Sequence, residues 1–215
     1  MIILIGGEKG GTGKTTLATN LAAQRALAGH DVLLIDADLQ QSASYWAQVR
    51  EEADIVPRVA CVQKYGKGLR AEIQDLAGRY EDLIVDAGGR DSIELRVSLV
   101  ASGKAYIPVQ ASQFDIWTLD HMDELVATAR GFNPDLRAFV VIMRASPNPL
   151  VSEAAEARAI LPDYRHLEAA QTILHDRIAY RRSSREGLAV SELSPLDSKA
   201  ATELASFYKE VFDES

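Results

Sequence analysis

Short apolar runs alternate with longer segments in which apolar residues recur every three or four positions. The short runs are typical of strands buried on both faces. They predict strands at 2–5, 31–36, 59–62, 83–85, 105–109, 139–143 and 172–174. The periodic segments predict amphipathic helices at 14–28, 41–52, 69–80, 93–101, 114–130, 152–161, 176–186 and 197–212. Gly29 follows the first helix, where a glycine that ends a helix is expected.

Strands that alternate with helices predict right-handed βαβ units. Such units build an α/β fold with a mostly parallel sheet flanked by helices, three layers in all. The chain shows no internal repeat, low-complexity tract or long linker, so residues 1–215 are expected to form a single domain. The apolar N-terminal run is too short for a signal peptide, and no later window is apolar over the length of a membrane span. We therefore expect a cytoplasmic protein.

Composition and charge narrow the range of partners. The 215 residues include 23 Lys and Arg against 31 Asp and Glu, which gives a formal net charge of -8 at pH 7. An overall basic field is excluded, so any contact with nucleic acid has to come from a local basic patch. Cys61 is the single cysteine, which excludes a disulfide framework and a cysteine-based metal site.

A glycine-rich turn links the first predicted strand to the first predicted helix. Backbone N–H groups of such a turn bind phosphate oxygens, and its glycines let the backbone approach closely. Lys14 is placed to reach the β- and γ-phosphates of ATP, and Thr15 to hold Mg²⁺. The predicted nucleotide-binding residues, called the phosphate loop below, are Lys9, Gly10, Gly11, Thr12, Gly13, Lys14, Thr15 and Thr16.

The phosphate loop departs from the usual pattern at its start. The position of the first glycine is Glu8, and a second lysine, Lys9, precedes the glycines. Residues 9–16 resemble the deviant Walker A motif of the ParA/MinD ATPases. The resemblance implies a P-loop NTPase fold, ATP hydrolysis, and a Lys9 that reaches across a nucleotide-sandwiched dimer to the partner's ATP. A cation supplied in this way offsets phosphate charge only when two copies meet, so a homodimer is expected on ATP binding.

Carboxylates follow two of the predicted strands, at the edge where open α/β sheets hold their ligands. Asp36 and Asp38 come after the second strand, and Asp86 ends the strand 83–85 in the Walker B form. Asp86 is expected to bind Mg²⁺ together with Thr15 and Asp36.

The resemblance to the ParA/MinD family extends to the loop after the second strand, where the family pattern is Asp-x-Asp-Pro-Gln. It implies that Asp38 positions the attacking water, so that Lys9, Lys14 and Asp38 form the catalytic set. Leu39 stands where the pattern has proline, which leaves this loop less fixed. Many family members read adenine with an asparagine after a later strand. Arg144 occupies that place here, so no base-contacting residue is assigned.

A cluster of arginines stands out near the C-terminus of this acidic chain. Like charges on one helix face repel each other, whereas a phosphate backbone would bind them with release of counterions. ParA-like proteins bind DNA without sequence preference through basic residues in this region. The alternative is a solvated helix whose arginines pair with nearby Asp176 and Glu186. The candidate DNA-binding residues are Arg177, Arg181, Arg182 and Arg185.

Taken together, the motifs resemble those of small plasmid ParA proteins over nearly the whole chain. The resemblance implies a DNA partition ATPase: an ATP-bound homodimer coats nucleoid DNA, and a ParB-type centromere-binding protein stimulates hydrolysis and releases it. One alternative is a ParA-like positioning ATPase for another cargo, and a second is a nucleotide-dependent scaffold that does not hydrolyse ATP. A third is a MinD-like ATPase that cycles on membranes. The acidic residues at the C-terminal tip argue against binding to anionic lipid, so no membrane partner is expected.

Overall fold

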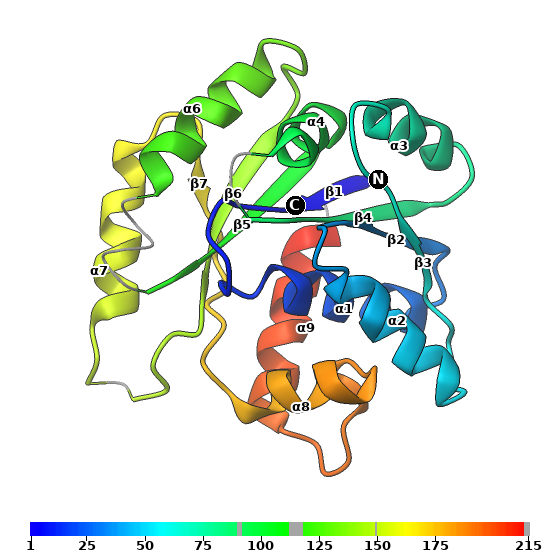
Figure 1. Ribbon diagram of the computed structural model, residues 1–215. Coiled ribbons are helices and arrows are strands. Elements are labelled where there is room, and N and C mark those ends of the chain that lie inside the picture. The colour runs from blue at the N-terminus through cyan, green and yellow to red at the C-terminus, as the bar shows by residue number, and fades with distance from the viewer. Residues whose placement is uncertain (90–91, 112–117, 149, 213–215) are drawn as a thin grey trace.

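A seven-stranded parallel sheet runs through the centre of the molecule (Figure 1). The computed structural model describes residues 1–89, 92–111, 118–148 and 150–212, and all statements on structure refer to these residues. The strand order is β3-β2-β4-β1-β5-β6-β7. The strands are β1 (Ile2–Ile5), β2 (Val32–Ala37), β3 (Ala60–Gln63), β4 (Asp82–Ala87), β5 (Lys104–Gln110), β6 (Arg137–Met143) and β7 (Glu168–Ala169).

Helices cover both faces of this sheet, which confirms the predicted three-layer α/β architecture (Figure 1). One face carries α1 (Lys14–Leu27), α2 (Ser42–Glu52), α8 (Ile178–Glu186) and α9 (Ser198–Phe212). The other carries α3 (Leu69–Ala77), α4 (Ile93–Ala101), α6 (Leu119–Arg130) and α7 (Glu153–Ile160). Two short 3₁₀ turns, η1 (Leu161–Asp163) and η2 (Val190–Glu192), complete the described elements.

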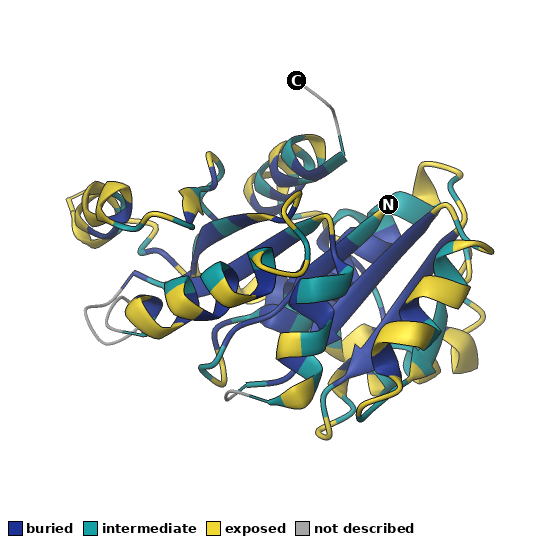
Figure 2. Ribbon diagram, turned by 90° about the horizontal axis from the view of Figure 1, so that it is seen from above, coloured by how far each residue is buried: buried dark blue, intermediate teal, exposed yellow. Residues whose placement is uncertain are grey.

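The sheet separates two hydrophobic cores. In β1, Ile3 and Ile5 pack with α1 and α9, whereas Leu4 packs with the helices of the opposite face. Successive side chains of a strand point to opposite faces, so a strand covered on both sides has to be apolar throughout. This is why the strands read as continuous apolar runs. Figure 2 shows the interior strands largely buried and the outer surfaces of the helices exposed.

The sequence prediction is wrong for the last strand. The structure forms β7 at Glu168–Ala169 and leaves 172–174 without a strand. Leu174 is nevertheless buried, and its N–H donates to the carbonyl of Ile142 at 2.9 Å. The apolar residue that suggested a strand therefore fills the core from an extended connection. The predicted helix 114–130 is described only from Leu119 onward, and its first residues lie outside the described part of the chain.

The strand order brings the predicted site segments together. β2, β4 and β1 are neighbours, and Asp86 of β4 lies in register with Asp36 of β2 and with Ile5 of β1. The segments that follow these three strands therefore emerge side by side at one edge of the sheet. No helix among the described residues is long and apolar enough to cross a membrane.

Candidate functional site

The phosphate loop wraps the N-terminus of α1. Gly11 and Gly13 adopt left-handed backbone conformations with φ of 78° and 102°, which favour glycine over residues with a Cβ. A Cβ on Gly13 would also lie 2.9 Å from the Cε of Met143. The loop therefore turns tightly enough to direct its N–H groups, and those of the first turn of α1, toward one point.

Lys14 is the buried cation of this loop, with a relative exposure of 7%. Its ammonium group donates to the carbonyl oxygen of Lys9 at 2.7 Å, so the loop closes on itself. Burial lowers the pKa of Lys14, and the nearby carboxylates Asp86 and Asp38 oppose that shift. A triphosphate offers a charged acceptor in place of a neutral carbonyl, so Lys14 is preorganised to exchange one for the other.

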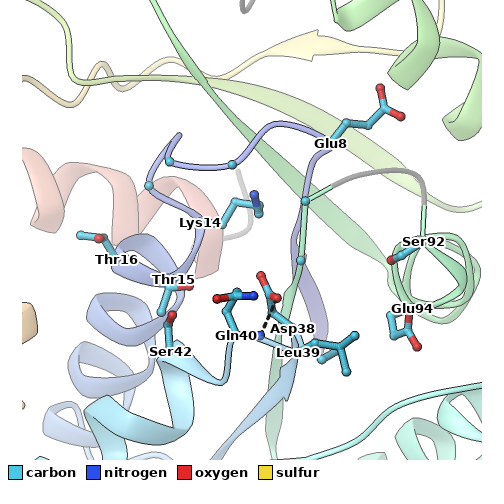
Figure 3. A pocket seen from close by; sticks show the side chains of 16 residues that line it. Glu8, Lys14, Thr15, Thr16, Asp38, Leu39, Gln40, Ser42, Ser92 and Glu94 are labelled. Atoms are coloured by element: carbon cyan, nitrogen blue, oxygen red, sulfur yellow. Dashed lines mark hydrogen bonds between the residues drawn. The ribbon is translucent and has the colours of Figure 1, made fainter.

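A cavity of about 840 Å³ opens beside the phosphate loop. In Figure 3 the side chains of Lys14, Asp38 and Gln40 face the same space, and Leu39 lies on the side of Asp38 toward Glu94. The lining residues come from the end of β2, from the loops after β1, β2 and β4, and from the starts of α1, α2 and α4. They are Glu8, Gly10, Gly11, Gly13, Lys14, Thr15, Thr16, Ala37, Asp38, Leu39, Gln40, Ser42, Gly88, Gly89, Ser92 and Glu94.

Thr15 and Asp86, two of the predicted magnesium ligands, are in direct contact. The Thr15 hydroxyl donates to Asp86 Oδ2 at 2.6 Å, while the buried Oδ1 of Asp86 has no hydrogen-bond partner among the described residues. Burial raises the pKa of Asp86 to about 7; the Thr15 hydroxyl and Lys14 oppose the rise, and Asp36 and Asp38 add to it. A divalent cation would relieve both the unpaired oxygen and the crowding of negative charge. The pair therefore fits Mg²⁺.

Asp36, the third predicted magnesium ligand, holds backbone groups. It is fully buried, and its two carboxylate oxygens accept from the N–H of Asp38 at 3.2 Å and of Ser44 at 2.8 Å. Ser44 lies in the first turn of α2, where N–H groups lack partners within the helix. Asp36 thus ties the loop after β2 to the start of α2, and its part in metal binding remains a prediction.

Asp38 lies beside the phosphate loop, next to the glycines that follow β4. Its Oδ1 accepts from the N–H of Gln40 at 2.9 Å. A Cβ on Gly88 would come within 2.6 Å of the Asp38 carboxyl carbon, and one on Gly89 within 2.9 Å of the Glu8 carbonyl. The two glycines therefore let three loops approach closely enough to share one cavity.

A smaller cavity of about 160 Å³ continues the site on the other side of the phosphate loop, sharing Gly11, Gly13 and Thr16 with the first. Its other lining residues are Met143, Arg144, His175, Asp176, Arg177, Tyr180 and Arg181. The Tyr180 hydroxyl is buried and has no described partner. Arg144 adopts a left-handed conformation with φ of 54°, and its guanidinium lies 3.4 Å from the Gly11 carbonyl. The two cavities together give a long ligand room on both sides of the phosphate loop.

The four candidate DNA-binding arginines lie together around α8, and three of them pair with nearby carboxylates. Arg177 binds Glu203 through a mostly buried ion pair, Arg181 pairs with Asp176 at 3.1 Å, and Arg182 pairs with Glu186 at 3.0 Å. The solvated-helix alternative predicted the two pairings with Asp176 and Glu186. Arg185 is exposed and makes no ion pair with a described residue.

Sequence reasoning missed several residues that shape the site. The Tyr65 hydroxyl donates to the carbonyl of Asp38 at 3.3 Å, and Glu94 accepts from the N–H of Gly66 at 2.9 Å. His121 lies 2.6 Å from Glu8, at the position where the loop departs from the usual pattern. These contacts join segments far apart in the sequence, so no local motif marks them.

Fold and site together define a P-loop nucleotide-binding protein. The chain belongs to the family described as CobQ/CobB/MinD/ParA nucleotide binding domain, which matches residues 3–190. It is therefore an ATPase of the ParA/MinD type, as the phosphate loop predicted.

Known relatives cover most of the chain. The maintenance of carboxysome distribution protein A of Halothiobacillus neapolitanus is 27% identical over 94% of this chain and 92% of its own length. The chromosome-partitioning ATPase Soj of Thermus thermophilus is 29% identical over 73% of this chain and 74% of its own. The septum site-determining protein MinD of Pyrococcus horikoshii, solved with Mg-ADP, superposes with a TM-score of 0.76 at 18% identity, covering 99% and 96% of the two chains. That likeness confirms the fold.

Proposed function

We propose that this ATPase moves or positions a cargo along DNA through an ATP-gated cycle of dimerisation, as a ParA-type partition protein does. The observation that carries the proposal is the second lysine of the phosphate loop. Lys9 precedes the glycines and lies between Glu8 and Gly10, which both line the large cavity, while Lys14 already supplies the cation expected of an ordinary phosphate loop. A further cation at this place suits a site completed by a second copy of the chain.

Within one subunit, the phosphates of ATP lie against the N–H groups of the phosphate loop and the Lys14 ammonium. Thr15 and Asp86 would hold a magnesium ion, whose charge would neutralise phosphate oxygens. Magnesium binds proteins through one or two side chains and completes its shell with phosphates and water.

Asp38 is the residue that we expect to orient the attacking water. Its carboxylate lies in the large cavity, and the hydrogen bond from the Gln40 N–H fixes one of its oxygens. The nucleoside of ATP would occupy the smaller cavity, which begins at the same glycines. Arg181 of the predicted DNA patch lines that cavity, so the nucleotide and DNA sites share a wall.

In the ATP-bound dimer, the arginines around α8 from two copies would meet nucleoid DNA without sequence preference. Each copy contributes few free cations, so doubling their number is what makes binding effective. A partner protein on the cargo, of ParB type where the cargo is DNA, stimulates hydrolysis and releases the dimer. The cycle couples ATP turnover to movement of the cargo.

A first experiment measures sedimentation and DNA binding with ATP, with ADP and without nucleotide. We expect a dimer that binds DNA with ATP alone. DNA binding that is absent under all three conditions would refute the DNA-based cycle. DNA binding that is equal with and without ATP would refute the switch.

A second experiment tests the lysine. Lys9→Ala should retain nucleotide binding by the monomer and lose ATP-dependent dimerisation and turnover. Lys199→Ala, which removes an exposed lysine of α9, serves as the matched control. Full turnover and dimerisation in Lys9→Ala would rule out the role of Lys9 in the partner's site.

The cargo divides the proposal into two candidates. The motifs in the chain favour DNA partition, and the Soj relative has a partitioning name. The carboxysome-distribution relative matches over a larger share of both chains, which favours a protein assembly as cargo. Deletion of the gene distinguishes them: loss of a plasmid or chromosome region indicates partition, whereas clustering of a protein assembly with normal DNA inheritance indicates positioning.

A MinD-like membrane cycle receives no support from the last described helix. Its apolar residues Leu204, Phe207 and Val211 are buried against the sheet and α1. An amphipathic membrane anchor needs its apolar face available for lipid.

A further inference from the structure

The loop that carries Asp38 is short and exposed, and its own sequence restrains its backbone only weakly. It spans residues 38–41 between β2 and α2, and Leu39 within it is 76% exposed. Leucine leaves both backbone dihedrals free at a position where proline would fix one of them. A residue that orients water has to be held within a fraction of an ångström, so something else has to restrain this loop.

The two peptide groups that flank Asp38 are both anchored. On the N-terminal side, the Asp38 N–H donates to Asp36 Oδ1 at 3.2 Å. On the C-terminal side, the Asp38 carbonyl accepts from the Gln41 N–H at 2.9 Å and from the Tyr65 hydroxyl at 3.3 Å. Asp36 and Gln41 belong to the same strand–loop segment as Asp38. Tyr65 comes from the separate loop between β3 and α3, and so ties the Asp38 loop to another part of the fold.

The Tyr65 loop is itself held from the opposite wall of the cavity. Glu94, in the first turn of α4, accepts from the N–H of Gly66 at 2.9 Å. Gly66 has a left-handed φ of 79°, which favours glycine at this turn. The N–H of Lys64 donates to the Asp36 carbonyl at 3.1 Å, which keeps the start of the loop alongside β2. The segment that carries Tyr65 is therefore fixed at both ends.

We propose that Tyr65 is a positioning residue for ATP hydrolysis: its hydroxyl, anchored through the Gly66–Glu94 contact, holds the Asp38 loop in the orientation that hydrolysis needs. The inference rests on the proposed role of Asp38. Tyr65 does not line the cavity, and it acts through the backbone of Asp38. Burial and the neighbouring Asp36 raise the pKa of Tyr65, which keeps the phenol protonated as a donor.

The test is Tyr65→Phe, which removes the hydroxyl and keeps the ring. We expect kcat for ATP hydrolysis to fall about threefold to tenfold, the value of one neutral hydrogen bond, with the Kd for ATP within about twofold. Tyr45→Phe is the matched control, because Tyr45 is an exposed tyrosine of α2 with no hydrogen bond from its hydroxyl to a described residue. Wild-type kcat in Tyr65→Phe, or a loss explained by weaker ATP binding alone, would overturn the inference.

A rescue experiment separates loop positioning from any other role of the phenol. The Leu39 N–H makes no hydrogen bond to a described residue, so Leu39→Pro removes no hydrogen bond and stiffens the loop. We expect Leu39→Pro to restore kcat in the Tyr65→Phe background. Failure of a folded double variant to recover would show that the hydroxyl acts otherwise. Hydrogen exchange gives a second measure: Tyr65→Phe should speed exchange at the Gln40 and Gln41 amides, and unchanged exchange there would count against the inference.

Asp38→Ala distinguishes failure of this inference from failure of the proposed site. Loss of turnover in Asp38→Ala together with wild-type turnover in Tyr65→Phe would refute the role of Tyr65 alone. Wild-type turnover in Asp38→Ala would refute the role of Asp38, and with it any positioning of Asp38.

Discussion

Asp86 shows at the scale of one residue how the site is prepared for a cation. It is a buried carboxyl group whose pKa burial raises to about 7, with Asp36 and Asp38 close by. Replacing it by an amide removes a charge that the fold solvates poorly, while the Thr15 hydroxyl keeps an acceptor. We expect Asp86→Asn to stabilise the ligand-free protein by on the order of 1–3 kcal/mol in chemical unfolding. The same variant should lose the dependence of ATP binding on Mg²⁺, and a protein destabilised by the change would contradict this account.

Gly88 sets the distance between β4 and Asp38, since a Cβ there would lie 2.6–2.8 Å from the atoms of the Asp38 carboxyl group. Gly88→Ala should therefore displace this side chain and lower kcat at least about tenfold, with ATP binding retained. Gly78→Ala is the control, because a Cβ at Gly78 would meet its nearest neighbour at an ordinary 3.6 Å. Steady-state hydrolysis and nucleotide titration together measure both quantities. Equal kcat in the two variants would show that Asp38 tolerates the shift.

Single residues also mark the limit of what the sequence predicts about the site. The phosphate loop, Asp38 and Asp86 were predicted because each follows a strand in a recognisable local pattern. Tyr65 and Glu94 follow no such pattern, since their contacts depend on how β3 and α4 pack around β2 and β4. Asp36 was predicted as a metal ligand, and the structure adds the two backbone amides that it holds.

Among the elements, α2 is joined to the segment after α8 by hydrogen bonds from two of its side chains. Arg50 of α2 is 1% exposed and forms two 2.8 Å hydrogen bonds with the carboxylate of Glu192, which also accepts from the Ala189 N–H at 2.7 Å. Trp46 of the same helix donates to the Leu188 carbonyl at 3.2 Å. Since α2 begins at the Asp36 contact, these bonds form one continuous path from the nucleotide site to the end of the arginine helix.

Removal of Glu192 should cost far more than removal of an exposed acid that makes a similar pair. Glu192→Ala leaves the buried Arg50 guanidinium without its partner, and we expect a loss of about 3–5 kcal/mol. Glu186→Ala removes the exposed partner of Arg182 and should cost less than about 1 kcal/mol. Urea unfolding of the two variants measures both values. Comparable losses would mean that the buried pair is no stronger than the exposed one.

Elements were predicted well where the apolar pattern was long and poorly where it was short. The interior strands could be predicted because both of their faces are covered, so every position has to be apolar. Helix α4 could be predicted because its apolar residues recur with helical periodicity along one stripe. The sequence of 172–174 looks like a strand because Leu174 fills a core position, but its neighbours bond to α9 through Glu210 instead of to a sheet partner. Which short apolar segment pairs at a sheet edge depends on tertiary contacts that a local pattern does not contain.

At the scale of the whole molecule, charge decides how the protein can meet DNA. The net charge is -8, and Arg177, Arg181 and Arg182 already pair with carboxylates of the same chain. A DNA phosphate therefore has to compete with Asp176 and Glu186 for Arg181 and Arg182, whereas Arg185 is available without competition. This arrangement predicts weak binding by a single copy and steep salt dependence for the ATP-bound dimer.

Arg185 and Arg177 should behave differently when each is replaced by alanine. Arg185→Ala should lower the slope of log K against log salt by about one per lost phosphate contact and leave stability unchanged. Arg177 is mostly buried with Glu203. Burial on its own would raise the pKa of the Glu203 carboxyl group, but the hydrogen bonds from Arg177 and from the His175 N–H, with the charge of Arg177, together lower it. Arg177→Ala should therefore destabilise the fold, because Glu203 loses its partner.

The lowered pKa of Glu203 also makes stability depend on pH. It stabilises the folded wild type at any pH above the pKa that Glu203 has in the unfolded chain, and this stabilisation is lost as the pH falls through the pKa that Glu203 has in the folded protein. Arg177→Ala should thus show a smaller loss of stability on acidification. DNA titrations at several salt concentrations, with unfolding at neutral and acidic pH, separate an arginine that binds DNA from one that holds the fold. If the two variants share one profile, α8 does not divide these roles between its arginines.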